Sequence, residues 1–152
     1  MDFEKPSFMN HALDSAGGAY KRDEVPVGAV VVHVPTGRIV GRAGNNTLSR
    51  NDPTGHAEIL ALRQAGLALG TARLTDCDLY VTLEPCAMCA GAISHARIRR
   101  LYYGAADPKG GAVDNGVRFF QQPTCHHAPE TYGGIDEERA ADLLRRFFQK
   151  KR

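Results

Sequence analysis

Long apolar runs are missing from this sequence. Nowhere in its 152 residues is there a stretch approaching the about 18 apolar residues that a membrane-spanning helix needs, so no such segment is expected. Residues 1–6 lack a basic region followed by an apolar one, and a secretory signal is therefore not expected either. Internal repeats and low-complexity segments are absent as well. These absences predict a cytoplasmic protein without a membrane partner.

Strong charge of either sign is also missing. The formal net charge is +2 and the isoelectric point is about 8.4, below the value of about 9 that is typical of a strongly nucleic-acid-binding domain. This balance permits an acidic partner without arguing for one. A hydrophobic fraction of 43% and a charged fraction of 24% are ordinary for a globular protein. At about 100–200 residues per domain, we expect residues 1–152 to form one domain.

Cysteines are few, and their context argues against disulfides. In a chain without a secretory signal, the four cysteines are better explained as metal ligands or as buried thiols. Cys86 and Cys89 form a Cys-x-x-Cys pair. Cys77 and Cys125 have no such neighbour and are interpreted as small buried side chains.

The hydrophobic pattern predicts helices that alternate with strands. The predicted helices cover residues 7–23, 56–65, 86–95 and 136–150, and the predicted strands cover residues 27–34, 38–44, 78–83 and 99–103. Residues 104–134 are rich in Gly, Pro, Asn and Gln, and residues 117–120 are the best candidate for a strand within them. Such alternation is typical of an α/β sandwich around a mixed sheet.

Two short fragments carry the candidate chemistry. They are His56-Ala57-Glu58 and Pro85-Cys86-Ala87-Met88-Cys89. Each lies at the start of a predicted helix. Cys86 and Cys89 lie on the same face of their helix, because residues three apart are neighbours on a helix. A helix N-terminus stabilises thiolates through its free N–H groups and its dipole, and thiolate is the form that binds a metal.

The side chains of His56, Cys86 and Cys89 suit a catalytic zinc ion. Zinc takes imidazole and thiolate ligands in tetrahedral geometry, and three protein ligands plus a water molecule are the pattern of a catalytic site. Zinc lowers the pKa of this water to about 7. Glu58, close to His56 in the chain, is interpreted as the residue that moves protons. Together the fragments form the His-x-Glu and Pro-Cys-x-x-Cys signature of zinc-dependent nucleobase deaminases.

Other functions stay open on these residues alone. A deaminase of free guanine, cytosine or cytidine would need the same activated water. A binding module with a structural zinc would need a fourth protein ligand, and no second Cys-x-x-Cys pair is present to supply one. A thiol oxidoreductase using Cys86 and Cys89 would leave His56 and Glu58 without a role.

Beyond the zinc motif, the sequence resembles the bacterial tRNA-specific adenosine deaminases over nearly its whole length. The matching segments are residues 24–30, Asn45, residues 50–59, residues 79–93, Tyr103-Gly104, Asp107, residues 109–112 and the phenylalanine pair Phe147-Phe148. The chain departs from this family at Cys125-His126-His127, where relatives more often have an Asn-His pair, so the roles of His126 and His127 stay open.

The resemblance implies a fold, an assembly and a reaction. The fold is cytidine deaminase-like, a three-layer α/β/α sandwich with a mixed five-stranded sheet. The assembly is a homodimer with active sites near the subunit interface and one zinc ion per subunit. The reaction is deamination of adenosine to inosine at the wobble position (34) of the anticodon of an arginine tRNA.

The resemblance also implies residues that bind the substrate. Asn45 matches the base-binding asparagine of the family. The backbone carbonyl of Glu84 is expected to contact the exocyclic amine, and Asp107 matches a position in a loop that contacts the backbone of the flipped nucleotide. Cationic side chains are candidates for gripping the phosphates, namely Lys109, Arg145, Arg146, Lys150, Lys151 and Arg152.

Overall fold

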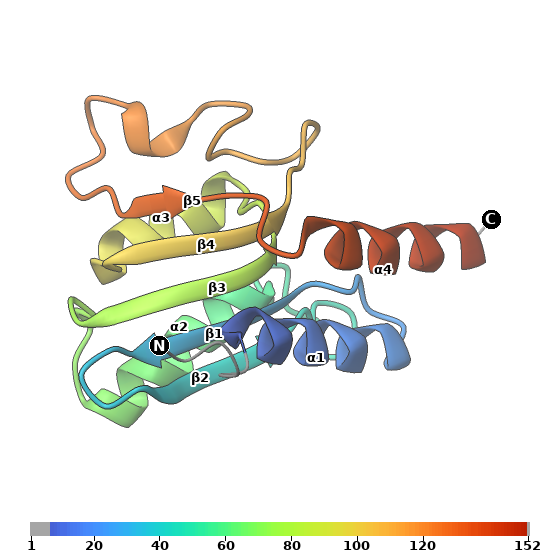
Figure 1. The fold of residues 1–152 in the computed structure, drawn as a ribbon, viewed down its shortest axis with the longest axis horizontal. Coiled ribbons are helices and arrows are strands. Elements are labelled where there is room, and N and C mark those ends of the chain that lie inside the picture. Colours follow the sequence, from blue (N-terminus) through green and yellow to red (C-terminus); the bar gives the residue numbers. More distant parts are fainter. Residues whose placement is uncertain (1–6, 152) are drawn as a thin grey trace.

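One mixed sheet of five strands organises the computed structural model, which describes residues 7–151 (Figure 1). The strands are β1 (Gly28–His33), β2 (Arg38–Gly44), β3 (Cys77–Leu83), β4 (Arg100–Ala105) and β5 (Glu130–Tyr132). Their order across the sheet is β2-β1-β3-β4-β5. β1 is antiparallel to both of its neighbours, whereas β3, β4 and β5 are parallel. β2, β3 and β4 therefore all end at the same edge of the sheet.

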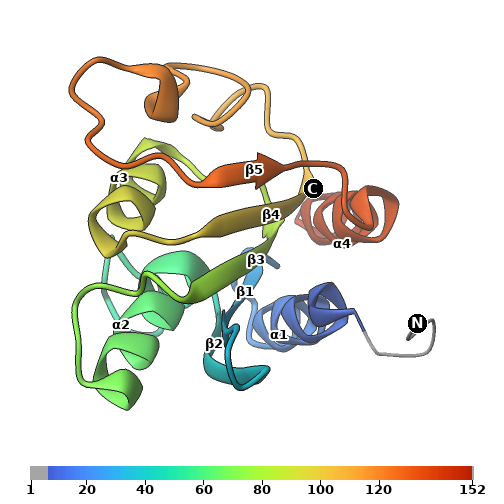
Figure 2. The same cartoon turned by 60° about the vertical axis from the view of Figure 1, so that its left-hand side comes forward.

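Helices cover both faces of this sheet in the described part of the chain. α1 (Phe8–Lys21) and α4 (Glu137–Lys150) lie on one face, and α2 (Ala57–Leu69) and α3 (Ala87–Ala96) lie on the other (Figure 2). This arrangement confirms the predicted three-layer α/β/α sandwich. Within residues 7–151, no helix combines the length and the apolar character that crossing a membrane requires.

The interior strand β1 is buried on both faces because each face meets a helical layer. Val30 and Val32 belong to the apolar cluster under α1, which includes Met9 and Leu13. Ala29 and Val31 alternate with them and belong to the larger cluster under α2 and α3. A strand buried on both sides reads as a continuous apolar run, which is what residues 27–34 display.

The ends of the helices follow from local capping. The side chain of Ser7 accepts a hydrogen bond from the backbone N–H of Met9 at 3.2 Å and so caps α1. α2 ends at Leu69 because Gly70 adopts φ +66°, a left-handed conformation that glycine reaches without steric cost.

The strand expected at residues 117–120 is wrong. Arg118 adopts a left-handed φ of 44°, and a short 3₁₀ helix, η1 (Phe119–Gln121), follows it. The fifth strand is instead β5, which pairs in parallel with β4. It has only three residues, so it is too short to show the alternation by which strands are identified in a sequence.

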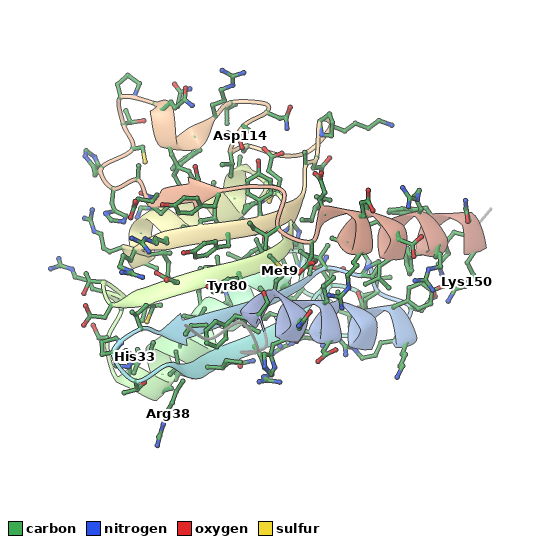
Figure 3. The ribbon with its side chains drawn as sticks, viewed as in Figure 1. Met9, His33, Arg38, Tyr80, Asp114 and Lys150 are labelled. Atoms are coloured by element: carbon green, nitrogen blue, oxygen red, sulfur yellow. The ribbon has the colours of Figure 1, made fainter. Side chains whose placement is uncertain are left out.

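The labelled side chains show where the hairpin lies relative to the other elements. His33 and Arg38 lie at the β1–β2 hairpin, at the opposite end of the molecule from Lys150 near the end of α4 (Figure 3). Asp114 lies in the long segment between β4 and β5, and Tyr80 lies on the face of the sheet near the start of α1 (Figure 3). Since His33 is paired with Cys77 at the start of β3, the edge where β3 ends is the one remote from the hairpin.

Two glycines near α1 should respond to alanine in opposite ways. A Cβ on Gly28 would lie 2.0 Å from the backbone oxygen of Ala12, whereas a Cβ on Gly17 would meet nothing within 4 Å. We expect Gly28→Ala to destabilise the protein by about 1–3 kcal/mol through overpacking. Gly17→Ala should stabilise it by about 0.5–1 kcal/mol, because alanine is the better residue inside a helix. Urea unfolding midpoints measure both, and a stable Gly28→Ala would contradict the close packing of α1 on β1.

Candidate active site and metal centre

The ends of three strands bring candidate residues to one edge of the sheet. Asn45 directly follows β2, Glu84 directly follows β3, and Asp107 follows the end of β4. These positions are far apart in the sequence. They meet because β2, β3 and β4 run in the same direction.

The three candidate ligands lie at the beginnings of two helices. His56 is the residue before α2, with an extended backbone (φ −74°, ψ 151°), and Cys86 is the residue before α3 (φ −73°, ψ 176°). Neither side chain caps its own helix, so both are available to other partners. Cys89 lies in the first turn of α3 and is fully buried.

The spacing of the three ligand atoms fits a tetrahedral zinc ion. Nδ1 of His56 lies 3.6 Å from Sγ of Cys86 and 3.5 Å from Sγ of Cys89. Zn–S bonds of about 2.3 Å and Zn–N bonds of about 2.0–2.1 Å at the tetrahedral angle require a separation of about 3.6 Å. Among residues 7–151, only these three side chains form such a cluster. Three soft donors without a fourth match the ligand count of a catalytic site.

The cluster also favours the thiolate that zinc requires. Hydrogen bonds from the Cys89 thiol and the His56 ring lower the pKa of Cys86 to about 4. The hydrogen bond with Cys86, together with burial, raises the pKa of Cys89 well above its ordinary range. The hydrogen bond to Cys86 raises the pKa of His56 in turn, against the opposing effect of burial.

Glu58 is a buried carboxyl group beside this cluster. It lies in the first turn of α2 and is only 4% exposed. Burial, together with the negative charge of Cys86, raises its pKa to about 7, although its own backbone N–H, His56 and Cys89 act in the opposite direction. A carboxyl group with a pKa near neutrality can both accept and donate a proton at physiological pH.

A pocket of about 160 Å³ opens at the cluster. It brings together residues that precede β1 and residues that follow β2, β3 and β4. Its lining consists of Val25, Val27, Asn45, His56, Glu58, Leu83, Glu84, Cys86, Asp107 and Gly110. Apolar walls with a few converging polar groups are typical of a site for a small flat ligand.

The predicted substrate-binding residues differ in their positions. Oδ1 of Asn45 accepts a hydrogen bond from the backbone N–H of Ala57 at 2.8 Å, which leaves its amide NH₂ group as the part that can donate to a ligand. Asp107 lines the pocket, and its Oδ1 accepts from the backbone N–H groups of Lys109 (3.2 Å) and Gly110 (3.0 Å). Lys109 is exposed and does not line the pocket.

The burial of two carboxylates and their hydrogen bonds to loops were not anticipated from the sequence. Glu24 and Glu84 are each only 2% exposed, and their side chains accept hydrogen bonds from loop backbone. Nothing in the one-dimensional pattern marks them, since each adjoins an ordinary apolar run. An acidic residue next to a strand is read as a surface residue unless its partners are known.

The cationic cluster of α4 is largely engaged within the chain. Arg145 and Arg146 pair with Asp142, at 3.5 and 2.7 Å. Lys151 pairs with Asp23 at 2.5 Å, and the Nζ of Lys150 lies 4.5 Å from the centroid of the Tyr20 ring. Arg152 lies outside the described residues. The four described cations are nonetheless exposed, so their assignment as phosphate contacts stays a prediction.

The Cys125-His126-His127 segment is held by structural contacts. Nε2 of His127 donates to the carbonyl of Ile98 at 2.7 Å, and the carbonyl of His127 accepts from the Ser94 hydroxyl at 2.7 Å. His126 is exposed. Cys125 is a half-buried free thiol, so the simple interpretation as a fully buried one is only approximate.

Comparison with known proteins gives this geometry a family. Residues 4–105 match the model of the cytidine and deoxycytidylate deaminase zinc-binding region. The chain is 61% identical to the tRNA-specific adenosine deaminase of Agrobacterium fabrum, over 98% of this chain and 97% of that protein. It is 47% identical to the tRNA-specific adenosine deaminase of Rickettsia bellii, over 95% of this chain and 99% of that protein.

A solved structure agrees with these relatives. It comes from a study of A-to-I editing by tRNA:A34 deaminases at the wobble position of transfer RNA, and it superimposes with a TM-score of 0.87 at 62% identity, covering 90% of this chain and 98% of the other. The chain belongs to the zinc-binding cytidine and deoxycytidylate deaminase family and, within it, to the family of the tRNA-specific adenosine deaminases.

Proposed function

We propose that this chain is a zinc-dependent hydrolase that deaminates adenosine to inosine at the wobble position (34) of a tRNA anticodon, with an arginine tRNA as substrate. The observation that carries the proposal is 61% identity to a tRNA-specific adenosine deaminase along 98% of the chain. The zinc motif alone would also suit a free-base deaminase. Similarity that extends over nearly the whole of both chains favours the tRNA enzyme.

The metal is held by His56, Cys86 and Cys89, with one zinc ion per chain. The separations between Nδ1 and the two sulfur atoms, 3.6 and 3.5 Å, support this ligand set. When bound, the zinc ion supplies activation of the attacking water molecule at neutral pH.

Glu58 moves the protons of the reaction. Water adds to C6 of the adenine, and Glu58 takes a proton from the water and delivers it to N1. Glu58 then takes the second proton, from the new hydroxyl group at C6, and passes it to the amino group, which leaves as ammonia as the C6 carbonyl of inosine forms. Its burial beside Cys86 and Cys89 supports the role, because the carboxyl group is withdrawn from bulk water where competing proton exchange occurs.

Three other pocket residues and the nearby exposed Lys109 hold the nucleotide. The NH₂ group of Asn45 donates to the base, since its Oδ1 is already bonded to Ala57. The backbone carbonyl of Glu84 accepts from the exocyclic amine, and Asp107 and Lys109 contact the backbone of the flipped nucleotide. An unpaired loop nucleotide suits this pocket, because extruding a paired base from its stack costs about a few kcal/mol.

The assembly and compartment complete the proposal. Residues 1–152 act as a single deaminase domain in the cytoplasm, where tRNA is modified. The chain forms a homodimer, supported by an apolar groove of about 480 Å³ between α2 and α3 and by Leu67, whose side chain is 86% exposed. A contiguous exposed apolar surface is one of the marks of a protein–protein interface.

A pair of variants separates metal binding from proton transfer. Cys86→Ala should lose zinc and activity together, because two ligands hold the ion poorly. Glu58→Gln should keep zinc but lose about 10²–10⁴-fold in turnover, since the amide cannot carry the proton. Cys125→Ala, at a free thiol outside the pocket, is the matched control and should keep both. Metal analysis and single-turnover assays measure these effects. Full zinc occupancy in Cys86→Ala, or normal turnover of Glu58→Gln, would contradict the assignment.

The substrate is tested by incubating the purified protein with total tRNA. Inosine should appear at position 34 of an arginine tRNA, detected by nucleoside mass spectrometry and by sequencing. Adenosine, guanine and cytidine as free compounds should be poor substrates, because they lack the flanking phosphates and stacked bases of an anticodon loop. Efficient turnover of a free base without inosine in tRNA would instead identify a nucleobase or nucleoside deaminase.

The homodimer should be evident in solution. Sedimentation equilibrium at micromolar concentration is expected to give twice the chain mass of 16.5 kDa. Leu67→Glu should shift the protein towards monomer, because it introduces a charge at the most exposed leucine of α2. A purely monomeric wild-type protein would remove this part of the proposal.

A further inference from the structure

Two carboxylates are buried at the functional edge without being part of the chemistry. Glu24 and Glu84 are each 2% exposed, and within residues 7–151 neither forms an ion pair with a basic side chain. A buried charge without a counter-ion is costly unless hydrogen bonds satisfy it. The partners that do so in this protein are the N–H groups of two loops.

The carboxylate of Glu84 is enclosed by the loop that follows β4. Four backbone N–H groups of this loop and one side-chain amide donate hydrogen bonds to the two carboxylate oxygens. The donors are Asp107 N (2.9 Å), Val113 N (3.0 Å), Asp114 N (2.9 Å), Asn115 N (3.0 Å) and Asn115 Nδ2 (2.7 Å). Burial raises the pKa of Glu84, yet these donors together hold it below the ordinary value. The loop is thus folded around an ionised side chain.

The fit between this loop and Glu84 is close. A Cβ on Gly111 would lie 2.5 Å from Cδ of Glu84, so a side chain there would displace either the carboxylate or the loop. Asp114, which donates its N–H to Glu84, also accepts from the hydroxyl of Tyr103 in β4. The loop is consequently fastened to the ends of both β3 and β4.

Glu24 does the same for the loop between β2 and α2. Its carboxylate accepts from three consecutive backbone N–H groups, those of Thr47 (3.1 Å), Leu48 (3.1 Å) and Ser49 (2.9 Å). The Ser49 hydroxyl adds a further bond at 2.9 Å. Burial raises the pKa of Glu24, and these donors again outweigh it. The loop begins at Asn45 and leads to His56.

Each loop supplies part of the pocket wall. Asn45 comes from the loop on Glu24, and Asp107 and Gly110 come from the loop on Glu84. We propose that Glu24 and Glu84 are positioning residues, each of which sets the shape of one side of the substrate pocket through its own loop. The assignment of these loops to RNA and base contacts rests on the proposed function.

A crossed experiment tests the proposal by hydrogen exchange. Glutamine keeps the size of glutamate but replaces one acceptor oxygen with a donor that opposes the loop N–H groups. In Glu84→Gln, amide exchange at Val113, Asp114 and Asn115 should accelerate by on the order of tenfold or more, with Thr47, Leu48 and Ser49 unchanged. Glu24→Gln should give the reverse pattern. Glu138→Gln, at an exposed position, is the control for loss of one charge and should change neither loop.

Kinetics with tRNA provide a second readout that general destabilisation does not mimic. Glu84→Gln should raise KM for tRNA more than it lowers kcat, because its loop carries Asp107 and Lys109. Glu24→Gln should mainly lower kcat, because its loop carries Asn45 beside the base. Zinc content should remain full in both. Milder variants, Asn115→Ala and Ser49→Ala, each remove one donor and should show the same patterns at smaller size if a glutamine variant fails to fold.

The outcomes separate this inference from the proposed function. The crossed exchange pattern supports positioning even if no inosine forms in tRNA, in which case only the substrate is wrong. Uniform acceleration through the amides of β1 and β3 would identify both residues as general stabilisers and overturn the inference. Unchanged exchange in the two loops would overturn it as well.

Discussion

The other elements of this fold depend on the close approach of the N-termini of α2 and α3. Nδ1 of His56, before α2, lies 3.6 Å from Sγ of Cys86 and 3.5 Å from Sγ of Cys89, at the start of α3. This meeting requires both helices to start at the same edge and on the same face of the sheet. The strand directions, the loops between β2 and α2 and between β4 and β5, and the burial of Glu58 all accommodate it.

Three buried glutamates at this edge show how surroundings set the charge of one residue type. Glu24, Glu58 and Glu84 are all almost completely inaccessible. The first and the last face several N–H donors each, and their pKa values fall below the ordinary value despite burial. Glu58 has few donors and a negatively charged sulfur nearby, and its pKa rises to about 7. At Glu24 and Glu84 the hydrogen-bond donors outweigh burial and favour a fixed anion, whereas at Glu58 burial outweighs them and leaves a group that can carry a proton.

The sequence was informative where chemistry or periodicity is local. The spacing of His56, Cys86 and Cys89 predicted the metal cluster, and the apolar stripes predicted all four helices within a few residues. It was uninformative where the determinants are remote. β5 depends on pairing with β4 across the sheet, and residues 117–120 turn because Arg118 is left-handed. The side-chain roles of Glu24 and Glu84 depend on loops 23 to 31 residues away, a distance over which a one-dimensional pattern carries no signal.

The antiparallel setting of β1 has a topological consequence. Two adjacent antiparallel strands end at opposite edges of a sheet. A third strand, antiparallel to the second, again ends at the same edge as the first. Between β2 and β3 the sheet contains two such reversals, one on each side of β1. Because the number of reversals is even, Asn45 lies at the same edge as Glu84 and Asp107. With an odd number, Asn45 would have been separated from the other two by the whole length of the strands.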